Sequence, residues 1–503
     1  MFIKRHLNEI IRCITLAFLI LVQLAIVSAI ATLLHHRSSV YVYILIEIVG
    51  MLSMLPLLAD NRNSAYKIFW ILIILIIPIG GHIMYALWGE EGIHHKQHSQ
   101  IRNVIQLANK HQIHDEKVQK KIEHMPVSKY LKRQDYPAYE DTDIEYFGLG
   151  EEGFAKILDD LSKAKEFIFI SFFMLADGCV LEKLKSVLIE RAKEGVEIRL
   201  MYDDAGSILK LSDHSLDDLF AFPNVKLKRF NQLDKNFVRH YYQYRNHQKI
   251  VVVDGDIGYT GAIYINDQYT NKPDHIDHWK GSAIRLSGKG VWSLSLIFLG
   301  MWGDKDEDYN RYRPIVTESK QGGICQPYAD GPANNEDNIA KDVYFLMAAE
   351  SRKILYIATP LLNLDDELSE ALALTAKAGV DVRIIVPGHT RYRGRKLLNE
   401  MSYGNLLRAG VRIYEYQPGL IYEKICLNDY SCKIGTVNLD FRSFYLHYEC
   451  GIMIYHEPLR KTVLKDFMET LEKSHEVTYQ EWKDRPWYKK TAQMFLKIIA
   501  CQF

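Results

Sequence analysis

The sequence predicts an α/β protein built from two similar halves, preceded by an apolar helical region. Strand-like and helix-like segments alternate from about residue 146 onward, which is typical of a sheet covered by helices. The segment AKEGVEIRLMY at 192–202 returns as AKAGVDVRIIV at 376–386. Similarity at this separation indicates duplicated domains rather than a short solenoid repeat.

Composition is that of a large globular protein. Of the 503 residues, 48% are hydrophobic and 25% charged, which excludes a disordered or collagen-like chain. The 62 Lys and Arg residues balance 62 Asp and Glu residues, which argues against a protein that coats nucleic acid. The seven cysteines contain no CxxC pair, so we expect neither a disulfide framework nor a zinc site.

Three apolar stretches lie in the first ninety residues. They are Cys13–Leu34, Val40–Leu58 and Ile68–Trp88, and a helix needs about 20 apolar residues to cross a bilayer. The second stretch is the weakest, because Glu47 interrupts it and a carboxylate is costly inside a membrane. The sequence therefore predicts two to three transmembrane helices within residues 1–90, and a multi-pass protein of the cell membrane.

Two further regions flank the predicted domains. Residues 91–145 are polar, and we expect a linker. Residues 476–503 mix tryptophans and lysines with apolar residues, which indicates either an amphipathic helix at a membrane surface or packing against the second domain. Residues 146–320 and 321–475 remain as the two α/β domains.

The expected strands are apolar runs rich in β-branched and aromatic residues. Between them lie segments with helical spacing. The expected strands are Phe167–Phe173, Val196–Tyr202, Ile250–Val253, Ile354–Ala358 and Val380–Val386, and the expected helices are Val180–Lys193 and Glu367–Lys377.

A charged motif surrounds the short strand Ile250–Val253. His247 and Lys249 precede the strand, and Asp254 follows it. Residues two apart on a strand face the same side, so the imidazole and the ammonium lie together. An imidazole can attack phosphorus and carry it covalently, and an ammonium can hold the phosphate oxygens. The pattern HxK(x4)D, followed by Gly261, therefore predicts phosphoryl chemistry.

The chain resembles the phospholipase D superfamily and, within it, the bacterial cardiolipin synthases. The resemblance implies two duplicated phospholipase D-like α/β domains that share one active site and need no metal or other cofactor. It also implies a membrane enzyme that acts on phosphatidylglycerol and other anionic phospholipids, and not on nucleic acid. The segments that carry the resemblance are PIGGHIMYALWGEE (78–91), YDDAGS (202–207), RNHQKIVVVDGDIGYTGAIYINDQY (245–269) and GTVNLDFRSF (435–444).

The resemblance also implies roles for the residues of the first motif. His247 would carry the phosphatidyl group as a phosphohistidine, Lys249 would hold the phosphate, and Asp254 would be a supporting carboxylate. In the second half, Asn438 and Ser443 match the family's GTxNxDxRS and would bind substrate.

The second motif departs from the family pattern. Tyr422 stands where the family has the histidine that protonates the leaving alcohol, whereas Lys424 and Asp429 match. A tyrosine has an unperturbed pKa of about 10 and a histidine about 6.5, so the phenol is less suited to donate a proton near neutral pH. Two interpretations stay open: Tyr422 is the catalytic acid, or it packs in an inactive half-site.

The first half departs from the family pattern as well. Tyr264 stands where an asparagine is usual, and Ala262 where a second glycine is usual. Gly281 replaces an aspartate, and Ser171 an acidic residue. We nevertheless expect the two motifs to meet in one site.

Three functions are compatible with these patterns. The first is a cardiolipin synthase that transfers a phosphatidyl group between two phosphatidylglycerol molecules through a phosphohistidine and releases glycerol. The second is a catalytically impaired relative that binds anionic phospholipid or pairs with an active synthase. The third is a nuclease or phosphodiesterase, which zero net charge favours least.

Overall fold

The computed structural model describes residues 17–18, 21–23, 25, 28–29, 32, 36–59, 63–89, 95–233, 243–271, 278–314, 322–332, 337–390 and 393–502. They form two compact units. One unit comprises residues 1–96, 231–244 and 494–503, and the other comprises residues 97–230 and 245–493. Apart from residues 231–244, both predicted halves therefore belong to the second unit.

The first unit is helical. Its helices include α2 (His36–Ser53), α3 (Leu55–Ala59), α4 (Ser64–Ile76) and α5 (Pro78–Trp88). The expected single helix over Ile68–Trp88 is wrong, because Pro78 starts a new helix at its first turn and cannot continue α4. Trp70 and Tyr85 pack edge to face across α4 and α5, with ring centroids 5.2 Å apart.

Among the described residues, no helix is long and apolar enough to cross a membrane. Val40–Leu58 is divided between α2 and α3, and most of Cys13–Leu34 lies outside the described residues. The expected multi-pass arrangement is therefore not supported by the described part of the chain.

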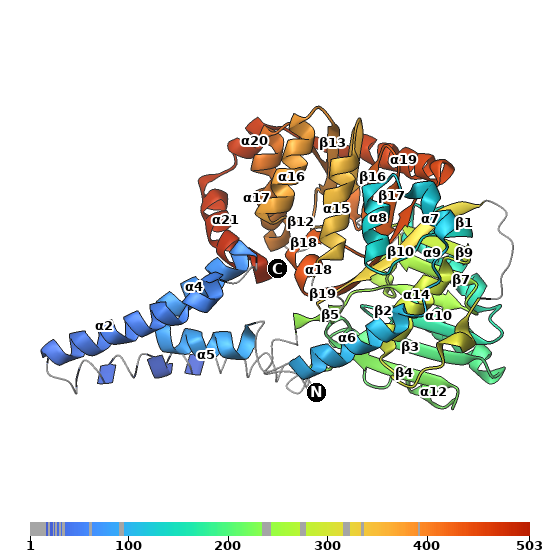
Figure 1. Ribbon diagram of the computed structural model, residues 1–503, viewed down its shortest axis with the longest axis horizontal. Helices are drawn as coiled ribbons and strands as arrows, with labels where there is room; N and C mark the ends of the chain where they lie inside the picture. Colours follow the sequence, from blue (N-terminus) through green and yellow to red (C-terminus); the bar gives the residue numbers. More distant parts are fainter. Residues whose placement is uncertain are drawn as a thin grey trace. The chain divides into compact units, whose positions relative to one another are not determined.

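The second unit is built on one mixed sheet whose strand order is β20-β14-β13-β11-β16-β17-β19-β10-β1-β9-β7-β6-β2-β3-β4. The two halves join where β1 of the first half pairs with β10 of the second, and β10 pairs in turn with β19, in the region labelled β1, β10 and β19 in Figure 1. The first half contributes β1 (Tyr139–Phe147), β2 (Phe167–Phe172), β3 (Glu197–Asp203), β4 (Val225–Phe230), β6 (Ile250–Val253), β7 (Ile257–Gly261) and β9 (Ala283–Gly288). The second contributes β10 (Gly323–Asp330), β11 (Ile354–Ala358), β13 (Asp381–Pro387), β14 (Arg412–Tyr416), β16 (Ile425–Asn428), β17 (Cys432–Gly435), β19 (His447–Ile454) and β20 (Ser474–Val477).

Each half repeats one topology. Three parallel strands, β2, β3 and β4 in the first half and β11, β13 and β14 in the second, continue into an antiparallel hairpin, β6–β7 or β16–β17. All five expected strands are confirmed, with shifts of at most one residue at their ends. Short strands β5 (Arg245–Asn246), β8 (His278–Lys280), β12 (Leu362–Asn363), β15 (Gly419–Ile421) and β18 (Leu439–Asp440) pair outside the main path.

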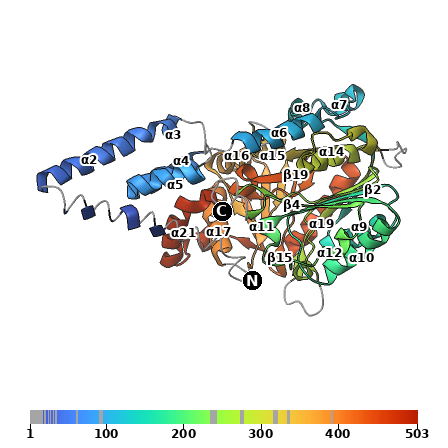
Figure 2. The ribbon, with the colours of Figure 1, turned by 90° about the horizontal axis from the view of Figure 1, so that it is seen from below.

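Helices cover both faces of the sheet. Figure 2 shows the sheet of the first half edge-on, with α14 (Val291–Trp302) on one face and α9 (Gly150–Leu161) and α10 (Cys179–Lys193) on the other. The remaining helices of this unit include α11 (Asp204–Ser207), α12 (Asp217–Phe220), α15 (Ile339–Glu350), α16 (Asp366–Lys377), α17 (Arg393–Arg408), α18 (Phe441–Tyr445) and α19 (Glu457–Glu472).

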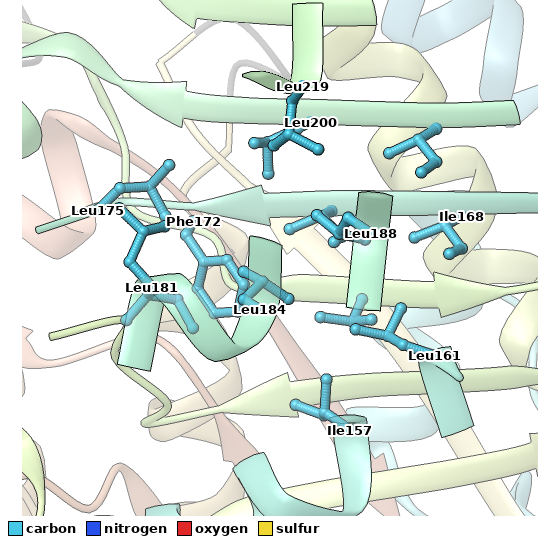
Figure 3. Close-up of a cluster of buried hydrophobic side chains, with 14 of the residues drawn as sticks. Ile157, Leu161, Ile168, Phe172, Leu175, Leu181, Leu184, Leu188, Leu200 and Leu219 are labelled. Atoms are coloured by element: carbon cyan, nitrogen blue, oxygen red, sulfur yellow. The ribbon is translucent and has the colours of Figure 1, made fainter. Parts of the chain in front are cut away.

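A buried apolar cluster joins β2 and β3 to α9 and α10 (Figure 3). Ile168 and Leu200 point from the strands, and Leu161, Leu184 and Leu188 point from the helices. Full burial of one such side chain contributes about 1.5–3 kcal/mol. The cluster therefore fixes β2, and with it the hairpin that follows His247.

The expected linker over residues 91–145 is folded for most of its length. It contains α6 (His95–Asn109), α7 (Glu116–Ile122), α8 (Pro126–Arg133) and the start of β1. Val118 and Leu131 are buried, and β1 pairs with β9 and β10 in the centre of the sheet. The expectation of a linker failed because the segment is polar on average, although a few apolar residues on one side of its helices are buried.

The C-terminal residues form β20, α20 (Tyr479–Lys483) and α21 (Trp487–Ile499). β20 is an edge strand paired with β14. Trp482 donates from its indole nitrogen to the backbone oxygen of Glu400 on α17, so α20 packs on the second half. In α21, Trp487 and Phe495 are 77% and 69% exposed.

Candidate active site

The site is centred on a pair formed between the two halves, His247 and Glu449. Nδ1 of His247 lies 2.8 Å from Oε1 of Glu449 and 3.0 Å from Oε2. Glu449 is on β19, and His247 follows β5, which pairs with β19 in parallel. The backbone N–H of His247 donates to the carbonyl oxygen of Tyr448. Strand pairing thus places the imidazole against the carboxylate.

The protonation states of the pair follow from burial and charge. Burial lowers the pKa of His247 to about 3, Lys249 adds to this effect, and Glu449 opposes it. Burial acts to raise the pKa of Glu449, but its contacts with His247 and His447 outweigh burial and lower it. The stable arrangement is a neutral imidazole that donates from Nδ1 to an ionised carboxylate. Nε2 of His247 then keeps a lone pair for attack on phosphorus.

Hydroxyl groups hold the carboxylate in place. Oγ1 of Thr436 donates to Oε2 of Glu449 at 2.5 Å, and Oγ of Ser443 donates to Oε1 at 2.8 Å. The backbone N–H of Asn438 donates to the same Ser443 hydroxyl at 3.2 Å. Ser443 therefore orients Glu449. Oδ1 of Asn438 is buried and has no hydrogen-bond partner among the described residues, so it can receive a donor from a ligand.

A second imidazole lies next to the pair. The ring centroids of His447 and His247 are 5.3 Å apart. Nε of Arg442 donates to Nε2 of His447, which places the proton of a neutral His447 on Nδ1. That Nδ1 has no hydrogen-bond partner among the described residues and lies 3.6 Å from Oε1 of Glu449.

The ligand atoms of His247, His447 and Glu449 lie within 4.8 Å of one another, a spacing that a metal ion could bridge. The arrangement suits a metal poorly. Nδ1 of His447 offers a proton instead of a lone pair, and two lysine ammonium groups lie beside the pair. The donors of this site fit an anion such as a phosphodiester.

Both motif lysines reach the same place. Nζ of Lys249 lies 5.2 Å from the ring centroid of Tyr264, and Nζ of Lys424 lies 5.7 Å from it. Each ammonium also donates to the backbone oxygen two residues before it, at 2.8 Å for Lys249 and 2.9 Å for Lys424. Two motifs 175 residues apart in the chain thus converge, as the sequence predicted.

Burial changes the acidity of both lysines. It lowers the pKa of Lys249 to about 8, against an opposing effect of Glu449. The pKa of Lys424 also falls well below its usual value, because of burial and then because of Lys249. Two buried ammonium groups close together destabilise each other, and a bound phosphate would relieve this repulsion.

Tyr422 occupies the histidine position of the second motif. Its hydroxyl accepts a hydrogen bond from Nη1 of Arg395 at 3.0 Å. Because the guanidinium can only donate, the phenolic proton of Tyr422 remains available to another acceptor. The ring packs against Trp279, with centroids 4.1 Å apart.

Asp254 and Asp429 lie at the other end of the hairpin strands from the lysines. Asp254 accepts hydrogen bonds from the backbone N–H groups of Lys165, Glu166 and Phe167, just before and at the start of β2. Asp429 likewise accepts from the N–H groups that precede β11. Both carboxylates therefore tie a strand end to a turn, and this placement favours a structural role in each half.

Sequence reasoning missed Glu449 and His447. The only signal was the string His-Tyr-Glu ahead of the apolar run CGIMI, where a carboxylate inside a buried strand is unusual. A buried ionised group needs a partner, so this position could have been singled out.

A duplicated α/β fold with one HxK-type motif from each half defines the phospholipase D superfamily. A family model described as cardiolipin synthase, PLD-like domain, matches residues 157–274 and 345–471. A second model, phospholipase D-nuclease N-terminal, matches residues 39–90. The chain belongs to the cardiolipin synthase family of this superfamily.

Similar proteins agree. The cardiolipin synthase of Halalkalibacterium halodurans is 28% identical over 476 residues, which cover 92% of this chain and 93% of that protein. Cardiolipin synthase 2 of Bacillus anthracis is 30% identical over 453 residues, covering 88% and 87%. The crystal structure of the phosphatidylserine synthase of Haemophilus influenzae covers 75% of this chain and 100% of its own, with a TM-score of 0.57 and 16% identity, a likeness of fold. The family supports a phosphatidyltransferase function.

Proposed function

We propose that the protein is a cardiolipin synthase that transfers a phosphatidyl group from one phosphatidylglycerol to another and releases glycerol. The observation that carries this proposal is the His247–Glu449 pair next to Lys249. A neutral imidazole held by a carboxylate is a nucleophile, and the adjacent ammonium suits a phosphate.

In the first step, Nε2 of His247 attacks the phosphorus of phosphatidylglycerol. The N–P bond forms, the P–O bond to the glycerol headgroup breaks, and the glycerol oxygen takes a proton. Glu449 stabilises the positive charge that develops on the imidazole. Lys249 and Lys424 would hold the phosphate oxygens, together with the second N–H of Nδ2 of Asn438, whose first N–H donates to Asp440.

In the second step, a hydroxyl of another phosphatidylglycerol attacks the phosphohistidine. The new P–O bond forms, the N–P bond breaks, and the hydroxyl proton leaves to a base. Cardiolipin is released and His247 returns to its neutral form. The group that gave a proton in the first step can take one in the second.

Tyr422 is our candidate for this acid and base. Its proton is not committed to Arg395, and the guanidinium would stabilise the phenolate left after proton donation. The resemblance places the family's acid at this position, and the convergence of the two motifs supports the assignment.

We propose that catalysis takes place at a membrane surface, where phosphatidylglycerol resides. Exposed Trp487 and Phe495 of α21, together with Lys489, Lys490 and Lys497 on the same helix, suit an anionic lipid surface.

Expression of the full chain in a synthase-deficient bacterium, followed by lipid analysis, tests the proposal. We expect cardiolipin to appear, and incubation with phosphatidylglycerol to add the mass of one phosphatidyl group to the peptide that contains His247. Absence of cardiolipin and of the adduct would exclude the proposal.

A second function is favoured by one observation, the lack of a histidine at position 422. A chain impaired in this way would bind anionic phospholipid or pair with an active synthase. It would bind phosphatidylglycerol vesicles without forming cardiolipin, and the same expression experiment separates the two functions.

A further inference from the structure

The two halves of the site can be matched residue by residue through their backbone pairing. The N–H of His247 donates to the carbonyl oxygen of Tyr448, and the N–H of Tyr422 donates to that of Lys280. The following residues are Glu449 in one case and Gly281 in the other. The second half-site therefore has a glycine where the first has its carboxylate.

The turns after the hairpins can be matched in the same way. The N–H of Thr436 donates to the carbonyl oxygen of Cys450, and the N–H of Ala262 donates to that of Ser282. The side chain of Asp440 caps the N–H of Ser443, and that of Asn266 caps the N–H of Gln268, in the same short turn of each half. When the two halves are aligned by these hydrogen bonds and by the pairing of β5 with β19 and of β15 with β8, five pairs of residues match. They are Thr436 and Ala262, Asn438 and Tyr264, Ser443 and Tyr269, His447 and Trp279, and His247 and Tyr422.

One half-site is polar and the other is aromatic. The half-site around His247 has imidazoles, hydroxyls, an amide and a carboxylate. At the matching positions, the half-site around Tyr422 has four packed rings and two small residues, Ala262 and Gly281. Trp279 stacks on Tyr269 and on Tyr422, with centroids 4.1 Å apart in both cases. Tyr264 meets Tyr269, Trp279 and Tyr422 edge to face at 4.7, 5.9 and 5.8 Å. Among the residues that form the two half-sites, the lysines Lys249 and Lys424 are kept in both.

The polar tips of the rings already have partners. The hydroxyls of Tyr264, Tyr269 and Tyr422 accept from Lys424, Lys210 and Arg395, at 3.4, 3.5 and 3.0 Å. Lysine ammonium groups lie within 6 Å of the ring centroids of Tyr264, Tyr269 and Tyr422. A water molecule needs about 2–4 polar partners to be held. Each phenol still has its own O–H proton to donate, but the faces of the four rings offer a water molecule no hydrogen bond.

We propose that the four rings, Tyr264, Tyr269, Trp279 and Tyr422, form the subsite of the acceptor alcohol, and that they exclude water so that the phosphohistidine passes to a lipid hydroxyl. The inference rests on the proposed function. The subsite includes Tyr422, the candidate acid and base of the proposed function, so a leaving alcohol would depart from it and an acceptor would enter it. The surrounding cations also disfavour an acceptor with an ammonium headgroup, and position 281 offers no carboxylate to bind one.

The two outcomes of the second step differ only in the attacking oxygen. With a lipid hydroxyl, a P–O bond forms, the N–P bond of His247 breaks, and the product is cardiolipin. With water, the same bonds form and break and the product is phosphatidic acid. In each case the attacking oxygen gives its proton to the base at Tyr422. The ratio of the two products therefore reports how well water is excluded.

The other half of the chain supplies the test variants. Tyr269→Ser and Tyr264→Asn install the residues of the polar half-site, and Tyr269→Phe and Tyr264→Phe keep the rings as matched controls. Purified full-length enzyme would be incubated with mixed micelles of phosphatidylglycerol and detergent, and cardiolipin and phosphatidic acid quantified from the same sample. We expect the ratio of phosphatidic acid to cardiolipin to rise at least about tenfold in the Ser and Asn variants, a usual effect of reshaping an apolar pocket, and to change little in the Phe variants.

The products distinguish a failure of the subsite from a failure of the proposed function. An unchanged ratio in folded Ser and Asn variants would overturn the subsite while leaving the transferase intact. Lack of both products with the wild type would overturn the proposed function and this inference together. If the variants do not fold, the wild type still decides: mostly cardiolipin supports the dry subsite, and mostly phosphatidic acid refutes it.

Discussion

His247 and Glu449 are 202 residues apart in the chain, yet Nδ1 of His247 lies 2.8 Å from Oε1 of Glu449. One half of the chain supplies the imidazole, and the other supplies the carboxylate that orients it. Neither half holds this pair by itself, so the site depends on the central strands that join the halves.

The charge of Glu449 should matter more than its shape. Glu449→Gln keeps the size of the side chain but removes the charge that orients and stabilises the imidazole. We expect kcat for cardiolipin formation to fall on the order of 10³–10⁴-fold, as when the carboxylate of a catalytic triad is neutralised. Glu457→Gln, at an exposed position, is the matched control. Equal rates for both variants would contradict the role of Glu449.

Removal of His247 should abolish turnover. His247→Ala leaves no nucleophile on phosphorus, and we expect a loss on the order of 10⁴-fold or more. The ring centroid of His447 lies 5.3 Å from that of His247, so His447 is the imidazole best placed to act as a substitute nucleophile. Any residual rate should therefore disappear in the double variant His247→Ala, His447→Ala. Robust cardiolipin formation by the double variant would show that the nucleophile lies elsewhere.

Tyr422→Phe removes one hydroxyl and keeps the stacked ring. If the phenol is the acid, we expect a rate loss on the order of 10²–10⁴-fold, with folding unchanged in a thermal melt. Tyr422→His should recover only part of this loss, because position 281 holds no carboxylate to orient the new imidazole. A full rate with Tyr422→Phe would assign the proton transfer to another group.

The pH profile of kcat/KM should reflect Lys249. Burial lowers the pKa of Lys249 to about 8, and the charged ammonium is the form that holds phosphate. That form is present below pH 8 and is lost as the pH rises through 8, so kcat/KM should fall on the alkaline side. His247, with a pKa of about 3, stays neutral above that value and should cause no loss between the two pKa values.

Lys249→Arg provides the control for this profile. A guanidinium keeps its charge throughout the range, so the alkaline fall should disappear even if the overall rate is lower. An alkaline fall that persists in Lys249→Arg would belong to a different group.

Asp254 should affect stability more than catalysis. Asp254→Asn keeps a residue that tolerates its positive φ of 51° but weakens three hydrogen bonds from backbone N–H groups. We expect the free energy of unfolding to fall by about 1–3 kcal/mol. The rate per folded molecule should stay close to that of the wild type. Asp306→Asn, on the surface, is the control, and a large kcat loss without destabilisation would restore a catalytic role to Asp254.

Much of the scaffold was predictable from sequence. Strands such as β6 and β11 are short apolar runs between polar turns, and a packed core leaves such runs few alternatives. The convergence of Lys249 and Lys424 followed from the repeat, since equivalent motifs on equivalent strands meet when two halves share one sheet.

The rest depended on contacts distant in sequence. Glu449 matched no expected motif, and only its pairing across strands reveals its partner. The roles of Tyr264 and Gly281 likewise become clear only from the strand pairing of the structure, because the residues that match them, Asn438 and Glu449, lie in the other half of the chain. The prediction of a linker before β1 was wrong because the segment is polar on average, and its composition does not reveal the few buried apolar residues, such as Val118.

The joining of both halves in one chain has an evolutionary consequence. In a homodimer of such halves, every substitution appears twice, once on each side of the symmetry axis. A change from histidine to tyrosine would then remove both imidazoles at once and end the chemistry. In a fused chain, each copy of the site drifts under its own selection. The nucleophile can be preserved on one side while the opposite side accumulates aromatic residues and acquires a separate preference for partners.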